Sequence, residues 1–511
     1  MRFAVCLLFA AAVSTVEAEQ TNLPSPPMMP APFKVPAPQE PLINKPPPPL
    51  VPTPASPYLS PVTGPVKQKS LMPPPTMLRN GADVMREGWR RMTPPPTAVS
   101  IAATQKVEQV VVKPPAPEPK KTVEPLWVGL VKSNRVWYVD ASGTDMNFGT
   151  RDAPWHSIQK AADVAQPGDT VLVMPGAYEG FETKRSGKPG RPIIFRAKRG
   201  AVVNASHHNP PDHILVRKTD WIVIEGFTVQ DAPRAGISVL ESSDVVVSNN
   251  VCGPNGVWGI FSGFAPHIQV IGNKAFKSRK EHGIYISNSR VADDNPIVRG
   301  NECFDNGTSG IQLNGDYNMG GDGLIDGALI EDNFLHDNDS KGFSLASIAG
   351  SIIRNNITCN NGRVAGAAGI HLSDEPGCGK PSHNNLVVNN TIIERRITAI
   401  RLSNGAYKNT IFNNLIVGPR GIVDEGGDNN IDTDSNLHIR DPLDVFVNPF
   451  NGDFHLRRGC RADHGGRWVF HEKRAPTNDI SGIVRSFDAL PSIGAYDMAP
   501  QVPVYEPAGK P

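Results

Sequence analysis

The sequence lacks three features that would assign it to common classes of protein. Its 511 residues include 51 Lys and Arg against 50 Asp and Glu, a net charge of +1, so it has no basic excess of the kind that favours nucleic acid. No apolar run reaches the roughly 18 residues that a membrane span needs. The 47 Gly show no period of three, which excludes collagen. We therefore expect neither a nucleic-acid partner nor a membrane span.

Cysteine is also scarce, and one cysteine, Cys6, lies in an N-terminal segment with the features of an export signal. Arg2, the apolar segment 4–13 and the small-residue site Val16–Ala18 are typical of a cleaved export signal. The alternative is a buried N-terminal helix. Loss of Cys6 with the signal leaves five Cys, so at least one thiol is unpaired or bonds between chains. We predict that residues 1–18 are a signal peptide and that the protein is secreted or periplasmic.

Proline is distributed very unevenly. Of the 50 Pro, 28 lie within residues 19–125. Because Pro fixes φ and removes a backbone donor, this segment is predicted to be an extended, disordered linker or stalk. The alternative is a ligand for a Pro-binding domain. Residues 499–511 are predicted to be a disordered tail.

Two marks recur through the remaining segment, residues 126–498. A Gly opens one short apolar stretch, and an Asn closes another. The Gly marks are Gly236, Gly259, Gly283, Gly310, Gly342 and Gly369, followed by Ala399 and Gly421. The Asn marks are Asn250, Asn273, Asn301, Asn333, Asn356, Asn390 and Asn414. The basic period is about 23 residues, and the longer intervals place insertions mostly at one turn.

This period predicts an all-β fold, a right-handed parallel β-helix solenoid. Leucine-rich repeats share the period but need a Leu consensus that is absent, and propeller blades need about 40 residues. Coils stack at about 4.8 Å, so like residues form ladders, and the recurring Asn is interpreted as structural rather than catalytic. The residues expected to point inward are Ile284, Ile286, Ile311, Leu313, Phe343, Leu345, Ile370, Leu372, Ile400 and Leu402.

The same register bears on the cysteines and on the open end of the solenoid. Cys252 and Cys303 lie two coils apart, about 10 Å, which is too far for a disulfide. Cys359 and Cys378 could meet across a coil. Residues Gln159–Ala165 are predicted to form a short helix that caps the first coil, because a solenoid end otherwise exposes core and strand edges.

The opening and the ending resemble secreted right-handed parallel β-helix proteins of the pectate lyase type. The resemblance extends over about residues 135–498 and implies the fold and a polysaccharide-related activity. The segments that carry it are Trp137–Gly143, Ala153–Trp155, Ile158–Ala161, Pro167–Val171, Pro175–Tyr178, Phe446–Leu456 and Ile493–Asp497.

The resemblance does not extend to catalytic residues. The β-helix lyases of the chondroitinase B and alginate lyase type carry a Lys on one strand and an Arg on the next, where this sequence has Asn288 and Gln312 or Asn314. The paired Asp motifs of galacturonan hydrolases are absent too.

Candidate site residues follow from the Gly-marked strand. The insertions, at residues 289–295, 316–326 and 373–383, all follow this strand and would wall its outward face. That face is predicted to be a sugar-binding groove, because aromatic rings stack on sugars and polar side chains bind hydroxyls and carboxylates. The alternative is an ordinary mixed surface. The substrate-binding candidates are Trp258, Phe261, His282, Gln312 and Asn314.

The catalytic candidates are those that an elimination on an acidic sugar requires. Removal of the C5 proton of a uronide needs a cation to neutralise its carboxylate and a base within hydrogen-bond reach. Arg401 and Lys341 are candidates for the cation. His371, His282 and Tyr285 are candidates for the base or acid, with His371 expected to be neutral between two cations.

A metal site is the last candidate. The loop 316–326 carries Asp316, Asp322 and Asp326 among three Gly, and hard oxygen ligands on a flexible loop suit Ca²⁺. Asp and Gly are also ordinary turn residues, and the spacing matches no EF-hand.

Three functions stay open on these residues. The first is a polysaccharide lyase that acts on an acidic polysaccharide by β-elimination of uronides. The second is a non-catalytic glycan-binding or surface-adhesion solenoid on a stalk. The third is a C5-epimerase, which shares the proton abstraction. We expect a monomer in each case.

Overall fold

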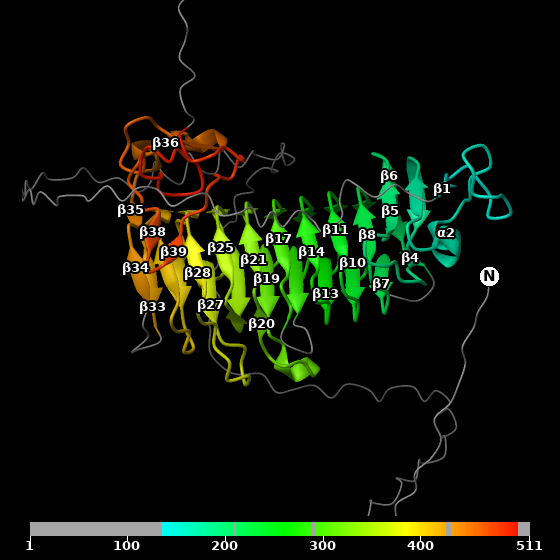
Figure 1. Ribbon diagram of the computed structural model, residues 1–511, viewed down its shortest axis with the longest axis horizontal. Coiled ribbons are helices and arrows are strands. Elements are labelled where there is room, and N and C mark those ends of the chain that lie inside the picture. The colour runs from blue at the N-terminus through cyan, green and yellow to red at the C-terminus, as the bar shows by residue number, and fades with distance from the viewer. Residues whose placement is uncertain (1–134, 208–210, 288–292, 426–430, 499–511) are drawn as a thin grey trace, which may run out of the picture. The chain divides into compact units, whose positions relative to one another are not determined.

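The computed structural model describes residues 135–498, apart from 208–210, 288–292 and 426–430. Within them the chain is a right-handed parallel β-helix whose coils stack one on the next (Figure 1). The fold prediction is therefore confirmed. The predicted signal peptide, linker and tail, residues 1–18, 19–125 and 499–511, lie outside the described residues.

Three parallel sheets run along the coils, and most coils contribute one strand to each. The twelve-stranded sheet pairs, in order, β1 (Val136–Val139), β2 (Thr170–Val173), β5 (Ile193–Ala197), β8 (Ile222–Glu225), β11 (Val246–Ser248), β14 (Gln269–Ile271), β17 (Ile297–Arg299), β21 (Leu329–Glu331), β25 (Ile352–Arg354), β28 (Leu386–Val388), β31 (Thr410–Phe412) and β34 (Asp432–Asp434).

The ten-stranded sheet carries the Gly marks. It pairs, in order, β4 (Phe181–Glu182), β7 (Ile214–Arg217), β10 (Ala235–Leu240), β13 (Trp258–Gly263), β16 (Ile284–Ser287), β19 (Ile311–Asn314), β23 (Phe343–Ala346), β27 (Ala368–Ser373), β30 (Thr398–Leu402) and β33 (Ile422–Asp424).

The eleven-stranded sheet completes each coil. It pairs, in order, β3 (Gly176–Glu179), β6 (Ala201–Ala205), β9 (Thr228–Val229), β12 (Val251–Cys252), β15 (Lys274–Phe276), β18 (Glu302–Phe304), β22 (Phe334–His336), β26 (Ile357–Cys359), β29 (Thr391–Ile393), β32 (Leu415–Val417) and β35 (Leu437–Ile439).

Short elements lie outside these sheets. An insertion after β19 holds the 3-10 helix η1 (Tyr317–Met319) and β20 (Ile325–Asp326), which pairs with β24 (Ile348–Ala349). The insertions after β19 and β27 protrude on one side of the coils (Figure 1), as the interval lengths predict. The C-terminal part contains η2 (Pro442–Asp444), β36 (Phe446–Asn448), η3 (Pro449–Asn451), β37 (Asp453–Leu456), β38 (Val469–Phe470) and β39 (Lys473–Arg474).

A ladder of buried Asn side chains fixes the register between coils. The backbone N–H and the side-chain Nδ2 of Asn250 both donate to Asn273 Oδ1, at 2.9 and 3.0 Å. The same pair of bonds links every later Asn mark to the next as far as Asn436. Each Nδ2 also donates to a carbonyl of the preceding coil, as Asn333 does to Val298. The structural interpretation of these Asn is confirmed.

The residue before each ladder Asn explains why the turn recurs. It has a positive φ, for example 65° at Gly272 and 59° at Asp332. Only Gly, Asn and Asp adopt this left-handed conformation readily, which accounts for the Gly-Asn, Asp-Asn and Asn-Asn pairs in the sequence.

The Gly marks reflect close approach between coils. A Cβ added at Gly259 would lie 2.7 Å from the carbonyl oxygen of Gly283, and one at Gly342 would lie 2.5 Å from that of Gly369. Any larger residue would push adjacent coils apart, so Gly recurs at the start of the strand.

The core is the apolar interior of the coils. All ten residues predicted to point inward are buried, from Ile284 to Leu402. Cys252 and Cys303 are buried and unpaired, as predicted. The possible Cys359–Cys378 pairing is wrong, because no disulfide joins the two residues. Cys378 Sγ instead donates to the Gly323 carbonyl across the insertion loops, at 3.0 Å.

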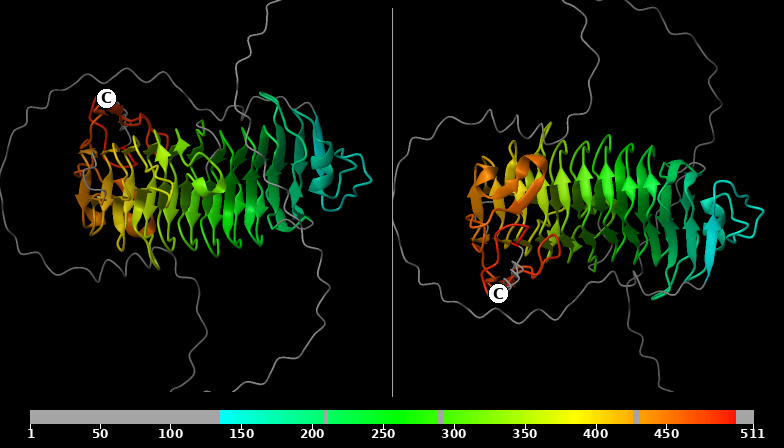
Figure 2. Two further views of the ribbon diagram at one scale, coloured as in Figure 1. Left: turned by 90° about the horizontal axis from the view of Figure 1, so that it is seen from below. Right: turned by 90° about the horizontal axis from the view of Figure 1, so that it is seen from above.

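A helix covers the first coil, and the C-terminal segment lies beside the last coils. Helix α2 (Ile158–Val164) lies at the first coil, one residue earlier than predicted, and the Ser157 side chain caps it by accepting from Lys160 N. The C-terminal segment packs along the last coils (Figure 2), where the fully buried Arg485 donates to Asn355 Oδ1 and to the Gly494 carbonyl.

The Asn ladder gives the first prediction. Asn333→Ala removes four hydrogen bonds at a fully buried position and leaves Asn301 donors unpaired. We expect the free energy of unfolding to fall by about 3 kcal/mol or more, since each unpaired buried group costs about 1–3 kcal/mol. Chemical denaturation measures this change. The exposed Asn451→Ala is the control and should alter little. Equal stability of both variants would contradict a ladder-based register.

Candidate functional site

The candidate residues follow one row on the outer face of the ten-stranded sheet. Strand register pairs each member directly with the next, so neighbours are about 4.8 Å apart along the solenoid. The row runs through Phe261, Tyr285, Gln312, Ser344, His371 and Arg401. The sequence-based register is thereby confirmed, and it brings residues from positions 261 to 401 onto one face.

The first end of the row is aromatic. The rings of Trp258 and Phe261 stack with centroids 4.4 Å apart and an interplanar angle of 17°. Tyr285 packs against both, at 5.8 and 5.4 Å, and the His282 ring meets Tyr285 edge-on at 5.4 Å. Trp258 Nε1 donates to Glu281 Oε2 at 2.8 Å. The rings of Trp258, Phe261 and Tyr285 remain partly exposed and form a surface on which a sugar ring can stack.

Polar contacts fix Tyr285 beside the insertion loop 316–326. Its hydroxyl donates to Asp316 Oδ2 at 2.7 Å, and Ser287 Oγ donates to the same oxygen at 2.6 Å. Asn314 Nδ2 donates to the Tyr285 hydroxyl at 3.2 Å. Burial, together with the Asp316 carboxylate, raises the pKa of Tyr285 far above its usual range. Tyr285 therefore keeps its proton.

Lys341 lies at the centre of the row. Its Nζ donates to Ser344 Oγ at 3.0 Å. Among the residues that the structure describes, no carboxylate lies within ion-pair distance of this ammonium group. Burial, and then the positive charge of Arg401, lowers the pKa of Lys341 below its usual value. Lys341 therefore loses its proton more readily than a solvated lysine.

The two histidines are more buried than the sequence suggested. His371 and His282 are each only 8% exposed, whereas an outward position predicts an exposed side chain. His371 shares a hydrogen bond of 2.8 Å between Nε2 and Ser403 Oγ. Thr308 Oγ1 lies 2.7 Å from His282 Nδ1, which also accepts from Ser309 N.

Burial and neighbouring cations keep both imidazoles neutral. Burial, followed by the charges of Lys341 and Arg401, lowers the pKa of His371 to about 3. Burial and Lys341 lower the pKa of His282 to about 3. The sequence also predicted a lowered pKa for His371, because of two neighbouring cations. In the structure, burial lowers this pKa more than the cations do.

Arg401 occupies the second end of the row. Its Nη2 donates to Glu425 Oε2 at 2.5 Å, in a partly exposed ion pair. Arg401 and His371 are direct register partners on adjacent coils. The cationic end of the row is therefore Lys341 and Arg401, with the neutral His371 between them.

The insertion loop 373–383 folds back towards Ser347 and Asn314. Ser347 Oγ donates to Asp374 Oδ1 at 3.1 Å and accepts from Glu375 N at 2.9 Å. Burial, together with Asp316 and Asp374, raises the pKa of Glu375. Glu375 thus lies near both Asp316 and Asp374. The sequence reasoning named the loop but neither acidic residue.

The three predicted metal ligands are not brought together. Asp316 is bound by Tyr285 and Ser287, whereas Asp322 Oδ1 accepts from Leu324 N. Burial and the charge of Asp322 raise the pKa of Asp326, so only these two are neighbours. Within the described ranges, no group of three or more His, Cys, Asp or Glu side chains is arranged to hold a metal ion. As arranged, these residues do not fit a calcium site.

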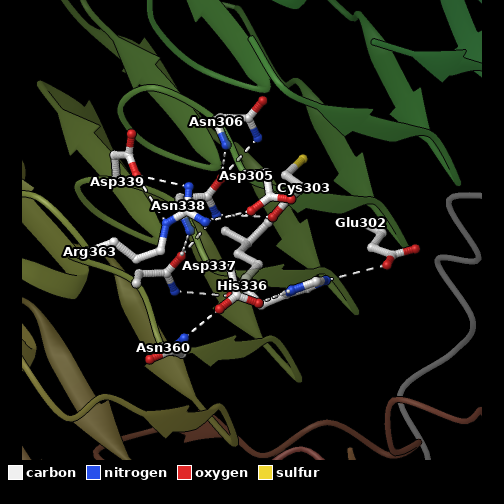
Figure 3. A network of polar contacts seen from close by, with 12 residues as sticks. Glu302, Cys303, Asp305, Asn306, His336, Asp337, Asn338, Asp339, Asn360 and Arg363 are labelled. Carbon is white, nitrogen blue, oxygen red and sulfur yellow. Dashed lines mark hydrogen bonds and ion pairs between the residues drawn. The ribbon is translucent and has the colours of Figure 1, made fainter. Parts of the chain in front are cut away.

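A second polar cluster lies on the eleven-stranded sheet, and the sequence reasoning missed it (Figure 3). His336 contacts Asp337 Oδ2 at 2.8 Å and Glu302 Oε1 at 3.4 Å. Burial alone would lower the pKa of His336, but these two hydrogen bonds raise it. The bond to His336 lowers the pKa of Glu302 to about 2. The charged side chains of this cluster are paired with one another. The cluster therefore stabilises the coils and offers no free reactive group.

Comparison with known proteins agrees with this fold. Residues 137–293 match the family model described as Pel9A-like, right handed beta helix region. Residues 270–440 match the model described as right handed beta helix region. The crystal structure of pectate lyase Pel9A superposes with a TM-score of 0.53 at 18% identity, covering 72% of this chain and 97% of that one.

Two curated proteins are similar in sequence over shorter stretches. The uncharacterized protein YwoF of Bacillus subtilis (strain 168) is 26% identical over 237 residues, which cover 44% of this chain and 46% of YwoF. Pectate lyase PEL9 of Emericella nidulans is 38% identical over 69 residues, 13% of this chain and 17% of that enzyme. The chain thus spans less than half the length of the curated relatives that it matches.

No helix among the described residues has the length and apolar character to cross a membrane.

The calcium prediction has a direct test. If calcium binds at loop 316–326, adding it should raise Tm, because a ligand that binds only the folded state stabilises it. Asp322→Ala should then abolish the rise. A Tm of the unaltered protein that is the same in calcium and in chelator would contradict the prediction.

The electrostatics of the row give a further prediction. His371 and His282 should stay neutral throughout about pH 5 to 8, where an ordinary His titrates. In Lys341→Met the pKa of His371 should rise, because a nearby positive charge is lost. NMR titration of the imidazole resonances measures both values. Lys198→Met, at an exposed position, is the control. An unchanged His371 pKa in Lys341→Met would show that the two groups are not neighbours.

Proposed function

We propose that this protein, a pectate lyase-like right-handed parallel β-helix, is a polysaccharide lyase that cleaves an acidic polysaccharide by β-elimination of a uronide. The observation that carries the proposal is the central lysine of the row. Lys341 is partly buried, has no carboxylate partner among the described residues and has a lowered pKa beside Arg401. An amine of this kind suits proton abstraction, and a permanent cation next to it suits a carboxylate.

The pKa shifts change the roles that the sequence suggested for His371 and Lys341. His371 is neutral, but a pKa of about 3 makes it a weak base that holds an abstracted proton poorly. Lys341 has its pKa lowered towards the working range and is the better base. We therefore assign proton abstraction to Lys341 and binding of the substrate carboxylate to Arg401.

The elimination then proceeds on a sugar held across the cationic end of the row. Arg401 binds the carboxylate and stabilises the negative charge that develops when C5 loses its proton. The neutral Lys341 amine takes that proton, and the electron pair forms the C4–C5 double bond. The C4–O bond breaks, and the leaving oxygen takes a proton from water. Trp258, Phe261 and Tyr285 hold the neighbouring sugar by stacking.

The relatives support the substrate class and the location. A pectate lyase is among the structural and the sequence relatives. A polysaccharide substrate and the export signal predicted at residues 1–18 both fit a secreted or periplasmic enzyme. We assign no step of the elimination to calcium.

The lyase proposal predicts a specific product and a specific pH profile. Incubation with acidic polysaccharides should generate unsaturated uronides, which ultraviolet absorbance detects. Because a lowered pKa means that Lys341 deprotonates below its ordinary value, kcat/KM should rise with pH from neutral to alkaline solution. His282, His371 and Arg401 are the charged or titratable groups that act on Lys341 or lie within its field. Of these, the two histidines stay neutral in that range.

Substitutions separate the roles. Lys341→Met and Arg401→Ala should each lower kcat by on the order of 10²-fold or more, whereas Tyr285→Ala should mainly raise KM. Lys198→Met should be without effect. Full turnover of both Lys341→Met and Arg401→Ala would place the site elsewhere. Inverted C5 centres without unsaturation would indicate an epimerase, and binding without any product would indicate a glycan-binding solenoid.

A further inference from the structure

The two ends of the row differ in charge. Its cations, Lys341 and Arg401, lie on the coils of β23 and β30, where Arg401 is also paired with the exposed Glu425. Over β13, β16 and β19 the row presents rings and the neutral side chains of Gln312 and Asn314. The ionisable groups that flank this aromatic end are carboxylates, Glu281 and Glu375.

Glu281 has no cation to neutralise it among the described residues. Its Oε2 accepts from Trp258 Nε1, and its nearest ionisable neighbour is His282 Nε2 at 3.8 Å. His282 is neutral above about pH 3, so this contact is not an ion pair at neutral pH. A negative charge therefore remains beside the stacking surface.

The insertion loops add negative charge beside β16 and β19. The Asp316 carboxylate accepts from two hydroxyl groups, and Asp374 accepts from Ser347 Oγ and from Lys380 N. These donors are uncharged. Asp316 and Asp374 both act to raise the pKa of Glu375, so the three carboxyl groups lie in one electrostatic neighbourhood. Within the described part of the chain, no Lys or Arg side chain forms an ion pair with any of the three.

This charge distribution bears on which polysaccharide fits. A homopolymer of uronate carries a carboxylate on every sugar. Bound along the row with one carboxylate at Arg401, it would bring further carboxylates to Glu281, Asp316 and Glu375. Like charges in a partly desolvated site repel strongly, and such repulsion excludes a competing ligand as effectively as a new contact selects one.

We infer that the site takes an acidic sugar over Lys341 and Arg401 and an uncharged sugar over Trp258, Phe261 and Tyr285. The substrate class is then a heteropolysaccharide in which uronates are flanked by neutral sugars. This inference rests on the proposed function and specifies its substrate.

The experiment compares three oligosaccharides of equal length for binding to the full-length protein by calorimetry at about 0.15 M salt. One is a uronate homo-oligomer, one alternates uronate with a neutral hexose, and one is the carboxyl-reduced form of the alternating oligomer. The alternating oligomer should bind at least about tenfold more tightly than either of the others, because charge repulsion weakens the first and loss of the carboxylate weakens the last.

A double variant tests the cause. Glu281→Gln with Glu375→Gln removes two negative charges without loss of volume, and it should raise the affinity for the homo-oligomer at least severalfold while leaving that for the alternating oligomer nearly unchanged. Glu225→Gln, on the twelve-stranded sheet, is the matched control and should change neither.

The outcomes are distinguishable. Homo-oligomer binding as tight as that of the alternating oligomer, with or without added calcium, overturns the inference and leaves the lyase proposal standing. If the carboxyl-reduced oligomer binds as well as its acidic parent, no carboxylate is recognised, and both the inference and the proposed function fail.

Discussion

The stacking of one coil on the next through buried amide ladders is the constraint on which the rest of the structure depends. A carboxamide can accept from the coil before it and donate to the coil after it, so a single Asn per coil satisfies buried polar groups on both sides. The chain from Asn250 to Asn436 uses this property throughout, although the insertions lengthen individual coils. The insertions can therefore vary without moving the strands, and each strand keeps the register of its neighbour.

The site is a consequence of that register. Lys341, His371 and Arg401 come from three successive coils, and only backbone pairing brings them to one face. Their burial then sets the chemistry. Partial removal from water lowers the pKa of Lys341 and that of His371, and the mutual repulsion of the cations adds to the effect. Asp316 and Glu375, the carboxylates on the insertion loops, lie beside Tyr285 and Asn314 and add negative charge at the aromatic end of the row.

The sequence predicted the repeating part of the structure well because the repeat has local causes. A left-handed turn selects Gly, Asn or Asp, close approach between coils selects Gly, and the two-residue period of a strand selects the inward positions. The ladder through Asn306, Asn338 and Asn361, which ends on the buried Glu394, was missed. Its signal is present, since each of these three Asn follows a ladder Asn by five residues.

Features that depend on long-range packing could not be predicted. The burial of His371 and His282 depends on the side chains around them, and no single-strand pattern reports it. The return of the insertion loop that places Glu375 near Asp316, and the packing of Arg485 against Asn355, likewise join segments far apart in sequence. The Cys359–Cys378 suggestion was wrong for the same reason, because spacing alone could not show that Cys378 lies on a loop that folds towards Gly323.

The central claim is that the outer face of the ten-stranded sheet binds a uronate at Lys341 and Arg401. A crystal structure of the Lys341→Met variant, soaked with an acidic oligosaccharide, tests it most directly. The account predicts a sugar carboxylate in ion-pair contact with Arg401, with the C5 hydrogen directed at residue 341 and an adjacent sugar stacked on Trp258 or Tyr285. An oligosaccharide bound on either of the other two sheets, with this face empty, would contradict it.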